Sequence, residues 1–220
     1  MKRKFTPSTN LNQIVERPAF FSPTAQYHVH FSNISDRLIE FLVRNKTKTT
    51  ALVGCQYWFS EERVLNYLAL QKLPVQFIVQ KQRIWQKNDD RKIAQSSSAA
   101  FRKYTMKVKL RDAYDRLVPL APSKEPVRCL GICSKRNQSA LLHHKFIVLL
   151  HDGRPWCAIT GSFNLTANAG NNLENLLIAE NEEIAQRFYN EWLALVPHSE
   201  SLDFKSPGLP KSKPKRQHSS

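Results

Sequence analysis

The amino-acid sequence predicts an α/β fold, and two local patterns carry this prediction. Residues 49–80 run from a β-branched and aromatic segment through a helical apolar stripe into a second apolar segment. A strand, a helix and a strand with short joints form a βαβ unit, in which the strands are parallel and the helix packs on the sheet. Residues 143–150 and 155–161 are apolar segments separated by Asp-Gly, which is typical of an antiparallel hairpin.

The first expected element is a helix from Ile34 to about Asn45. Its apolar residues recur every three to four positions, and Ser35 or Asp36 is the expected N-cap.

The βαβ unit comes next. Residues 49–59 are rich in β-branched and aromatic residues and are expected to form a strand. Ser60 is expected to cap the following helix, because Glu61 and Glu62 then lie at the positive end of the helix dipole. Residues 74–80 are the second strand of the unit.

Residues 81–125 form a basic insert with twelve Lys and Arg against five Asp and Glu. One or two amphipathic helices on the surface are expected here. The charges indicate either a solvated face or a flank that binds polyanions.

The second half of the chain is also predicted to contain strands and a helix. Strands are expected at residues 126–132, in the two arms of the hairpin and at residues 173–179. A last helix should begin at Asn181-Glu182-Glu183, with an apolar stripe formed by Ile184, Phe188, Trp192 and Leu195.

Composition favours one folded domain between two polar ends. With 41% apolar residues, including four Trp and twelve Phe, the chain can bury a sizeable core. Residues 1–19 are expected to be a basic arm, residues 20–197 the domain, and residues 198–220, which are rich in Ser, Pro and Lys, a disordered basic tail.

The cysteines and the apolar segments indicate an intracellular protein. Cys55, Cys129, Cys133 and Cys157 form no CxxC pair, and three of them lie in strand-like segments, where a reduced thiol behaves as a small core residue. The basic start lacks the apolar region of a secretory signal, and no stretch approaches the ~18 apolar residues of a transmembrane segment.

A net charge of +15 indicates a polyanionic partner. Nucleic acid is the first expectation and an anionic membrane surface the second, whereas a basic protein without such a partner remains the plain alternative. Part of this charge lies in the tail, at Lys211, Lys213, Lys215 and Arg216, which we expect to bind nucleic acid.

Four polar side chains converge at the open end of the predicted hairpin. Alternate residues of a strand share a face, so His143 and Lys145 point together and His144 points away. Ser162 and Asn164 follow the returning strand. This set suits a phosphodiester: the ammonium neutralises a phosphoryl oxygen, the hydroxyl and amide donate to it, and the imidazole attacks phosphorus or moves a proton. An edge device without catalysis is the alternative.

These residues resemble a known signature. His143-His144-Lys145, an apolar strand, a turn and Gly161-Ser162-Phe163-Asn164 are similar to the H-x-K…G-S-x-N motif of the phospholipase D superfamily. Leu173-Glu174-Asn175 resembles the downstream E-N element of that family. The layout of residues 20–80 is similar to the short, single-motif, Nuc-like endonuclease branch.

The resemblance implies a mixed β-sheet sandwiched between helical layers and metal-independent phosphodiester hydrolysis through a phosphohistidine. His143 would be the nucleophile, Lys145 and Asn164 would bind the phosphate, and Ser162 would add a hydrogen bond. Glu174 would hold the other imidazole nitrogen. No cofactor and no metal are expected.

Two features of the sequence bear on this resemblance. The family pattern has an aspartate five positions after the lysine, where this chain has Leu150, and Asp152 lies in the expected turn. The chain also has a single motif, and single-motif members complete their site as homodimers, so a homodimer with both His143 side chains in one cleft is expected.

The leading function is therefore a nuclease acting on DNA or RNA. A phospholipid (cardiolipin-type) hydrolase is the alternative enzyme, and a non-catalytic nucleic-acid-binding protein is the alternative from another class.

Overall fold

The structure is a computed structural model that describes residues 26–82, 98–122, 124–131, 141–166 and 172–203. Its centre is an eight-stranded sheet with the order β1-β8-β7-β6-β2-β3-β4, and β5 also pairs with β3. The strands are β1 (Tyr27–His30), β2 (Ala51–Gln56), β3 (Pro74–Gln80), β4 (Val118–Pro119), β5 (Val127–Leu130), β6 (Lys145–His151), β7 (Arg154–Gly161) and β8 (Leu176–Ala179).

The sheet is mixed, because two kinds of connection meet in its centre. The βαβ unit makes β2 and β3 parallel, and the hairpin makes β6 and β7 antiparallel. The hairpin joins the unit through an antiparallel pairing of β6 with β2. Both predicted units are confirmed, and their strands form the middle of the sheet.

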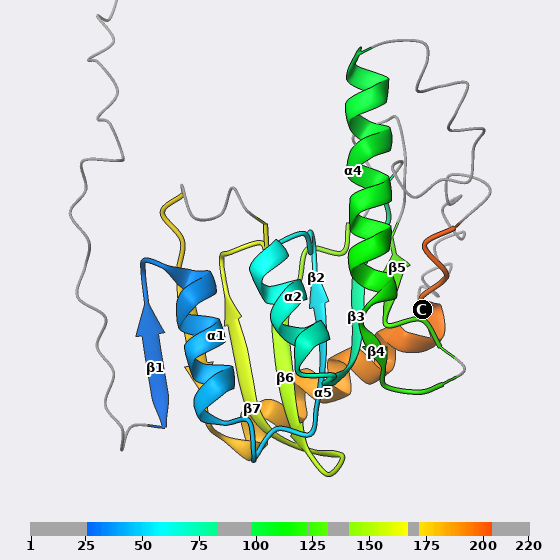
Figure 1. Cartoon of the computed structure of the whole chain (residues 1–220). Coiled ribbons are helices and arrows are strands. Elements are labelled where there is room, and N and C mark those ends of the chain that lie inside the picture. Colours follow the sequence, from blue (N-terminus) through cyan, green and yellow to red (C-terminus); the bar gives the residue numbers. More distant parts are fainter. Residues whose placement is uncertain (1–25, 83–97, 123, 132–140, 167–171, 204–220) are drawn as a thin grey trace, which may run out of the picture.

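Helices cover both faces of the sheet (Figure 1). On one face lie α1 (Ile34–Arg44), α2 (Glu62–Leu70) and α4 (Ser98–Asp115), and α5 (Glu182–Leu195) lies on the other. The chain then turns through a short 3-10 helix, Val196–His198. The expected α/β class, with a mixed sheet sandwiched between helical layers, is confirmed.

Each helical layer encloses its own apolar core. Leu38, Phe41 and Leu65 from α1 and α2 pack on one face of the sheet, and Trp192 from α5 packs on the other. Burial of both faces explains why the central strands are nearly continuous apolar runs.

The cysteines that the structure describes are part of these cores. Cys55, Cys129 and Cys157 are buried and unpaired. Burial raises the pKa of the Cys129 thiol to about 12 and raises the pKa of Cys55 and Cys157 as well. These thiols are therefore inert core side chains, as expected. Cys133 lies outside the described residues.

The hairpin turns at the predicted Asp-Gly pair, and each strand extends one residue closer to the turn than expected. His151 and Arg154 pair with each other as the last residues of β6 and β7, so only Asp152 and Gly153 form the turn. Both have positive φ, 46° and 81°, as a type I′ turn requires, and Asp and Gly tolerate that conformation. Asp152 thus has a structural role at the turn.

Two predicted helix caps were wrong by one to three residues. The N-cap of α1 is Asn33, with φ 51°, and neither Ser35 nor Asp36. The N-cap of α2 is Glu61. Ser60 lies one residue before this N-cap, and the backbone N–H groups of Ser60 and Glu61 both donate to the Leu165 carbonyl in a distant segment.

The tail prediction was also wrong at its start. Residues 198–203 belong to the fold: Glu200 forms an antiparallel bridge with Cys129, and Leu202 is buried in the core. Arg128 donates two hydrogen bonds to Ser199, which fastens the segment to β5. The predicted basic arm, residues 1–19, and the tail from residue 204 lie outside the described residues, as do Lys211, Lys213, Lys215 and Arg216.

Candidate active site

The candidate site lies at the edge of the sheet where β2 ends and β6 begins. Gln56, the last residue of β2, pairs with Lys145, the first residue of β6. The Thr160 hydroxyl donates to the Lys145 carbonyl over 2.9 Å and fastens this end of the strand to β7. The hairpin therefore brings the beginning of β6 next to the end of β7, as predicted.

His143 and Lys145 meet at this edge. The Lys145 ammonium lies 3.3 Å from Nδ1 and 3.4 Å from Nε2 of the His143 ring, and 3.2 Å from the His143 carbonyl oxygen. The ammonium therefore lies beside the imidazole ring, and both groups are available to one phosphate.

His144 points to the opposite side. Its Nε2 lies 3.1 Å from a carboxylate oxygen of Glu191 in α5, and its ring packs edge-on against Phe146. The predicted alternation is therefore confirmed: His143 shares a face with Lys145, and His144 joins the α5 side.

Hydrogen bonds connect the second half of the motif, Gly161-Ser162-Phe163-Asn164, to the downstream Glu174-Asn175 segment. The Ser162 hydroxyl donates to the Glu174 carboxylate and accepts from the Asn175 backbone N–H over 3.1 Å. The Ser162 N–H in turn donates to Asn175 Oδ1 over 3.2 Å. Gly161 is required here, because a Cβ would lie 2.0 Å from the Asn175 carbonyl oxygen.

These contacts differ from the roles that the resemblance implied. Glu174 was expected to hold the His143 imidazole, and in this structure its carboxylate is bound by Ser162. The Ser162 hydroxyl was expected to donate to a phosphate, but its hydrogen is used by Glu174. The carbonyl oxygen of the Asn164 side chain is buried and has no hydrogen-bond partner among the described residues.

Leu150 and Asp152 lie far from the His143–Lys145 pair. Leu150 is buried, pairs with Ala51 and sits at a register shift between β6 and β7. Both residues are near the turn, at the other end of β6 from Lys145. The position where the family has an aspartate is therefore at the turn end of the hairpin, away from His143 and Lys145.

Two residues of the site carried no prediction of a role. The Tyr57 ring packs against the His143 ring with centroids 5.0 Å apart and holds the imidazole from the side of β2. Gln56 is fully buried beside Lys145, and neither polar atom of its side chain has a partner among the described residues. A buried glutamine at the end of an apolar strand was the signal in the sequence, since buried amides need partners.

The Lys145 side chain is partly buried and ends in an ammonium group. Burial lowers the pKa of its ammonium, and the Glu174 carboxylate acts in the opposite direction. A lysine whose pKa is lower in the folded than in the unfolded protein destabilises the fold while it is charged, below the folded pKa. This cost disappears as the pH rises through that pKa towards ~10.4.

We expect Lys145→Met to remove activity without lowering stability. At pH 7 the variant should melt at or above the temperature of the wild type, because the partly buried charge is gone. The difference should shrink at pH 10, where the wild-type lysine loses its proton. Thermal melts at both pH values measure this; a variant that melts well below the wild type at pH 7 would mean that the ammonium stabilises the fold.

The part of the chain that the structure describes shows neither a metal site nor a membrane span. It contains no group of three or more His, Cys, Asp or Glu side chains that could share a metal ion. None of its helices is long and apolar enough to span a bilayer.

The sequence and the fold are similar to those of known proteins. An uncharacterized protein of Acanthamoeba polyphaga mimivirus is 25% identical over 203 residues, which cover 80% of this chain and 67% of the relative. The fold is similar to NucT from Helicobacter pylori, with a TM-score of 0.52 and 15% identity over 80% of this chain and 98% of that one. The TM-score with Nuc from Salmonella typhimurium, a phospholipase D family member, is 0.46. The two chains are 16% identical, and the match covers 82% of this chain and 98% of Nuc.

A family match covers the site itself. Residues 45–195, which include both halves of the motif, match the family described as "Cardiolipin synthase, PLD-like domain". With the His143–Lys145 pair and the Gly161–Asn164 segment on one edge of a mixed, helix-covered sheet, the chain belongs to the phospholipase D superfamily.

Proposed function

We propose that this protein is a nuclease that hydrolyses phosphodiester bonds through a phosphohistidine and completes its site by homodimerisation. The observation that carries the proposal is the contact between His143 and Lys145 at an exposed edge of the sheet. A side chain that can act as a nucleophile lies next to a cation that can neutralise the phosphate under attack.

The chemistry needs two histidines. The His143 nitrogen forms a bond to phosphorus, and the bond from phosphorus to the leaving oxygen breaks. The leaving oxygen takes a proton from a second imidazole, which then removes a proton from water. That water attacks the phosphohistidine and releases the histidine and a phosphate monoester. The second imidazole is His143 of a second copy.

The surroundings of the motif support an interface. Leu141, two residues before His143, is 52% exposed. Leu173, one residue before Glu174, is 57% exposed. Large apolar side chains that border a polar site are typical of surfaces that become buried in an assembly. A two-fold axis near the site would bury both leucines and bring two His143 side chains together.

Charge favours nucleic acid as the substrate. Among the described residues Lys and Arg only slightly outnumber Asp and Glu, so most of the +15 belongs to segments outside them. These basic segments, together with the basic helix α4, suit a long polyanion. The family description names cardiolipin synthase, so a phospholipid is the substrate to test against.

We expect cleavage of nucleic acid to persist in EDTA. The nucleophile is an imidazole and the phosphate is neutralised by Lys145, so neither step requires a metal ion. The purified protein should be incubated with plasmid, single-stranded DNA, RNA and anionic liposomes, each with EDTA. His143→Ala is the control for a contaminating nuclease.

The substrates separate the alternatives. Hydrolysis of liposomes alone would favour the phospholipid hydrolase. Binding of nucleic acid without cleavage of any substrate would favour the non-catalytic protein. Cleavage that stops in EDTA and returns with magnesium would contradict the phosphohistidine route.

A further inference from the structure

Helix α4 extends past the edge of the sheet that carries the candidate site. The helix has 18 residues, which corresponds to a length of about 27 Å. Figure 1 shows its upper part rising beyond the end of β2, where Gln56 and Lys145 pair. Leu110, Ala113 and Tyr114 are buried in its last turns, whereas no described side chain of residues 98–109 is buried.

The base of α4 is joined to the site. The Tyr114 hydroxyl donates to the Phe59 carbonyl, and the two rings stack with centroids 6.1 Å apart. Phe59 lies two residues after Tyr57, which packs on His143, and it also bridges to Leu165, the residue after Asn164. One short loop thus connects α4, the nucleophile and the second half of the motif.

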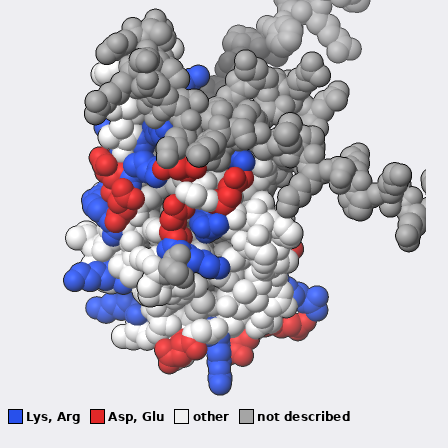
Figure 2. Space-filling model, turned by 90° about the vertical axis from the view of Figure 1, so that its right-hand side faces the viewer, with Lys and Arg blue, Asp and Glu red and all other residues white. Residues whose placement is uncertain are grey.

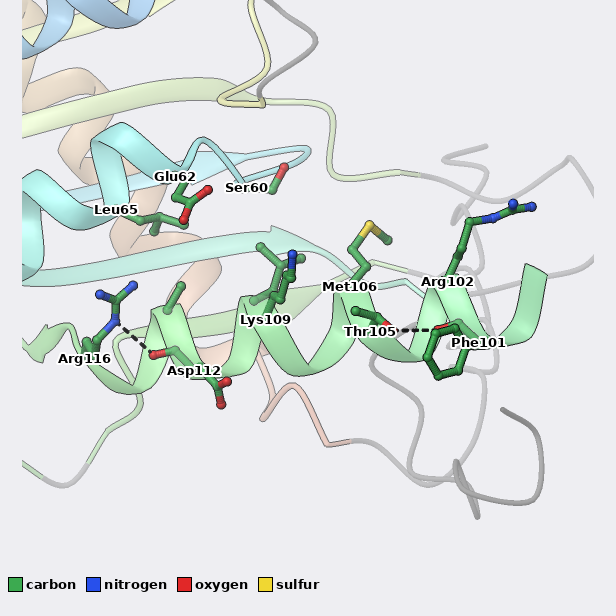
Figure 3. Close-up of a pocket in the computed structure, with 12 residues that line it drawn as sticks. Ser60, Glu62, Leu65, Phe101, Arg102, Thr105, Met106, Lys109, Asp112 and Arg116 are labelled. Atoms are coloured by element: carbon green, nitrogen blue, oxygen red, sulfur yellow. Dashed lines mark hydrogen bonds between the residues drawn. The ribbon is translucent and has the colours of Figure 1, made fainter. Parts of the chain in front are cut away.

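A groove separates α4 from the beginning of α2. Its volume is about 670 Å³, and Ser60, one residue after Phe59, lines it on the side of the site. Figure 3 shows Phe101, Arg102 and Met106 towards one end, on the projecting part of α4. Glu62 and Asp112 lie towards the other end, near the base of the helix.

The projecting part of α4 carries cations that are not neutralised. Arg102, Lys103 and Lys109 are exposed and form no ion pair with any described residue. Figure 2 shows Lys and Arg beside Asp and Glu over the body on this side of the molecule. Several cations of the body are paired: Arg37 with Glu40, Arg63 with Asp36, Lys81 with Glu200, Arg111 with Asp203, and Arg187 with Glu183.

An aromatic residue lies among these cations. Phe101 is 59% exposed, and it precedes Arg102 and lines the groove. An exposed aromatic ring next to Lys and Arg is the arrangement on which unpaired bases stack while the cations hold the phosphates. A duplex keeps its bases stacked inside and offers the ring no such partner.

We propose that the projecting part of α4 and the groove beside α2 bind a single strand of nucleic acid and lead it to the site. Arg102, Lys103 and Lys109 bind its phosphates, and Phe101 stacks on a base. The inference rests on the proposed nuclease function, because it names the surface that holds that substrate.

The test neutralises the three cations together. The variant Arg102→Gln, Lys103→Gln, Lys109→Gln is compared with Lys46→Gln, Lys72→Gln, Arg154→Gln, which removes three exposed cations near the opposite edge of the sheet. None of the six residues belongs to the catalytic machinery. Binding of a single-stranded oligonucleotide is measured by fluorescence anisotropy across a salt series, and cleavage is measured at saturating substrate.

We expect the α4 variant to bind about a hundredfold more weakly at 0.1 M salt, with a salt slope lower by about two, because each lost contact to a single strand lowers the slope by ~0.7. Its cleavage rate at saturation should equal that of the wild type. The control variant should keep most of its affinity. Equal losses in the two variants would overturn the inference and reduce the effect to net charge.

Phe101→Ser tests whether this surface prefers single-stranded nucleic acid to a duplex. It should weaken binding of single strands about tenfold and leave binding of a duplex unchanged. Equal effects on both would overturn the stacking role. If the wild type neither binds nor cleaves nucleic acid but hydrolyses liposomes, the proposed function fails; if it does both and the α4 variant matches the wild type, only this inference fails.

Discussion

Replacing His143 with alanine should reduce phosphodiester cleavage by at least about a thousandfold, whereas replacing His144 should retain most of the activity. His143 lies beside Lys145 on the face that holds the motif, and as the proposed nucleophile it forms the bond to phosphorus. His144 contacts Glu191 on the opposite face. That pair is exposed, so its loss should cost little stability.

Binding measurements separate chemistry from folding. His143→Ala should bind an oligonucleotide with nearly wild-type affinity, because the substrate is held mainly by cations elsewhere. Rate and affinity should be measured on the same preparations, together with a thermal melt. If His144→Ala were the inactive variant, the nucleophile would have to lie on the α5 side, and our assignment would be wrong.

Activity should also depend on a second copy of the chain. We expect the protein to sediment at twice its monomer mass of 25.4 kDa. After subunit exchange with an equal amount of His143→Ala, roughly a quarter of the dimers would keep both histidines. Activity per total protein should then fall to about a quarter of the wild-type value, whereas independent subunits would give a half.

Leu141→Asp offers a second test of the dimer. A carboxylate at this exposed apolar position should weaken the interface, so that activity is lost at low protein concentration and recovers as the concentration rises. Lys46→Asp, an exposed change near the opposite edge of the sheet, is the control. A monomer that cleaves at full rate would rule out the composite site.

His151 would be a poor replacement for the second imidazole in such a monomer. It ends β6, six residues after Lys145, which corresponds to about 20 Å along the strand. Its Nδ1 lies 2.9 Å from the Lys48 carbonyl oxygen, at the turn end of the hairpin. His151 is therefore too far from Lys145 to act on the same phosphate.

The sequence determined the middle of the fold because local signals there are strong. Long apolar runs, an Asp-Gly turn and a short strand–helix–strand unit each specify their own structure. They predicted β2, β3, β6 and β7 with errors at the ends of up to three residues. Asn181 was predicted to open the last helix, and its side chain does accept the Ile184 N–H over 2.9 Å.

Elements that depend on distant partners were predicted poorly. β4 has two residues and exists because Val118 and Pro119 pair with the beginning of β3. Residues 198–203 have a polar, tail-like composition, yet β5 pairs with Glu200. The insert was expected to hold one or two amphipathic helices on the surface. A helix, α4, is present and its first part is exposed, but the way it packs was not predicted: only its last turns are buried, where Tyr114 reaches Phe59.

The candidate site likewise has features that the sequence predicted and contacts that only the tertiary structure shows. Strand alternation alone placed His143 with Lys145 and turned His144 away, since neighbouring side chains of an extended chain must point to opposite faces. The partners of Glu174 and Ser162, the ring of Tyr57 against His143 and the contact of α4 with Phe59 could not be derived locally. They join residues far apart in the chain, and only the pairing of β6 with β2 and β7 and the packing of α4 on the Phe59 loop bring them within contact distance.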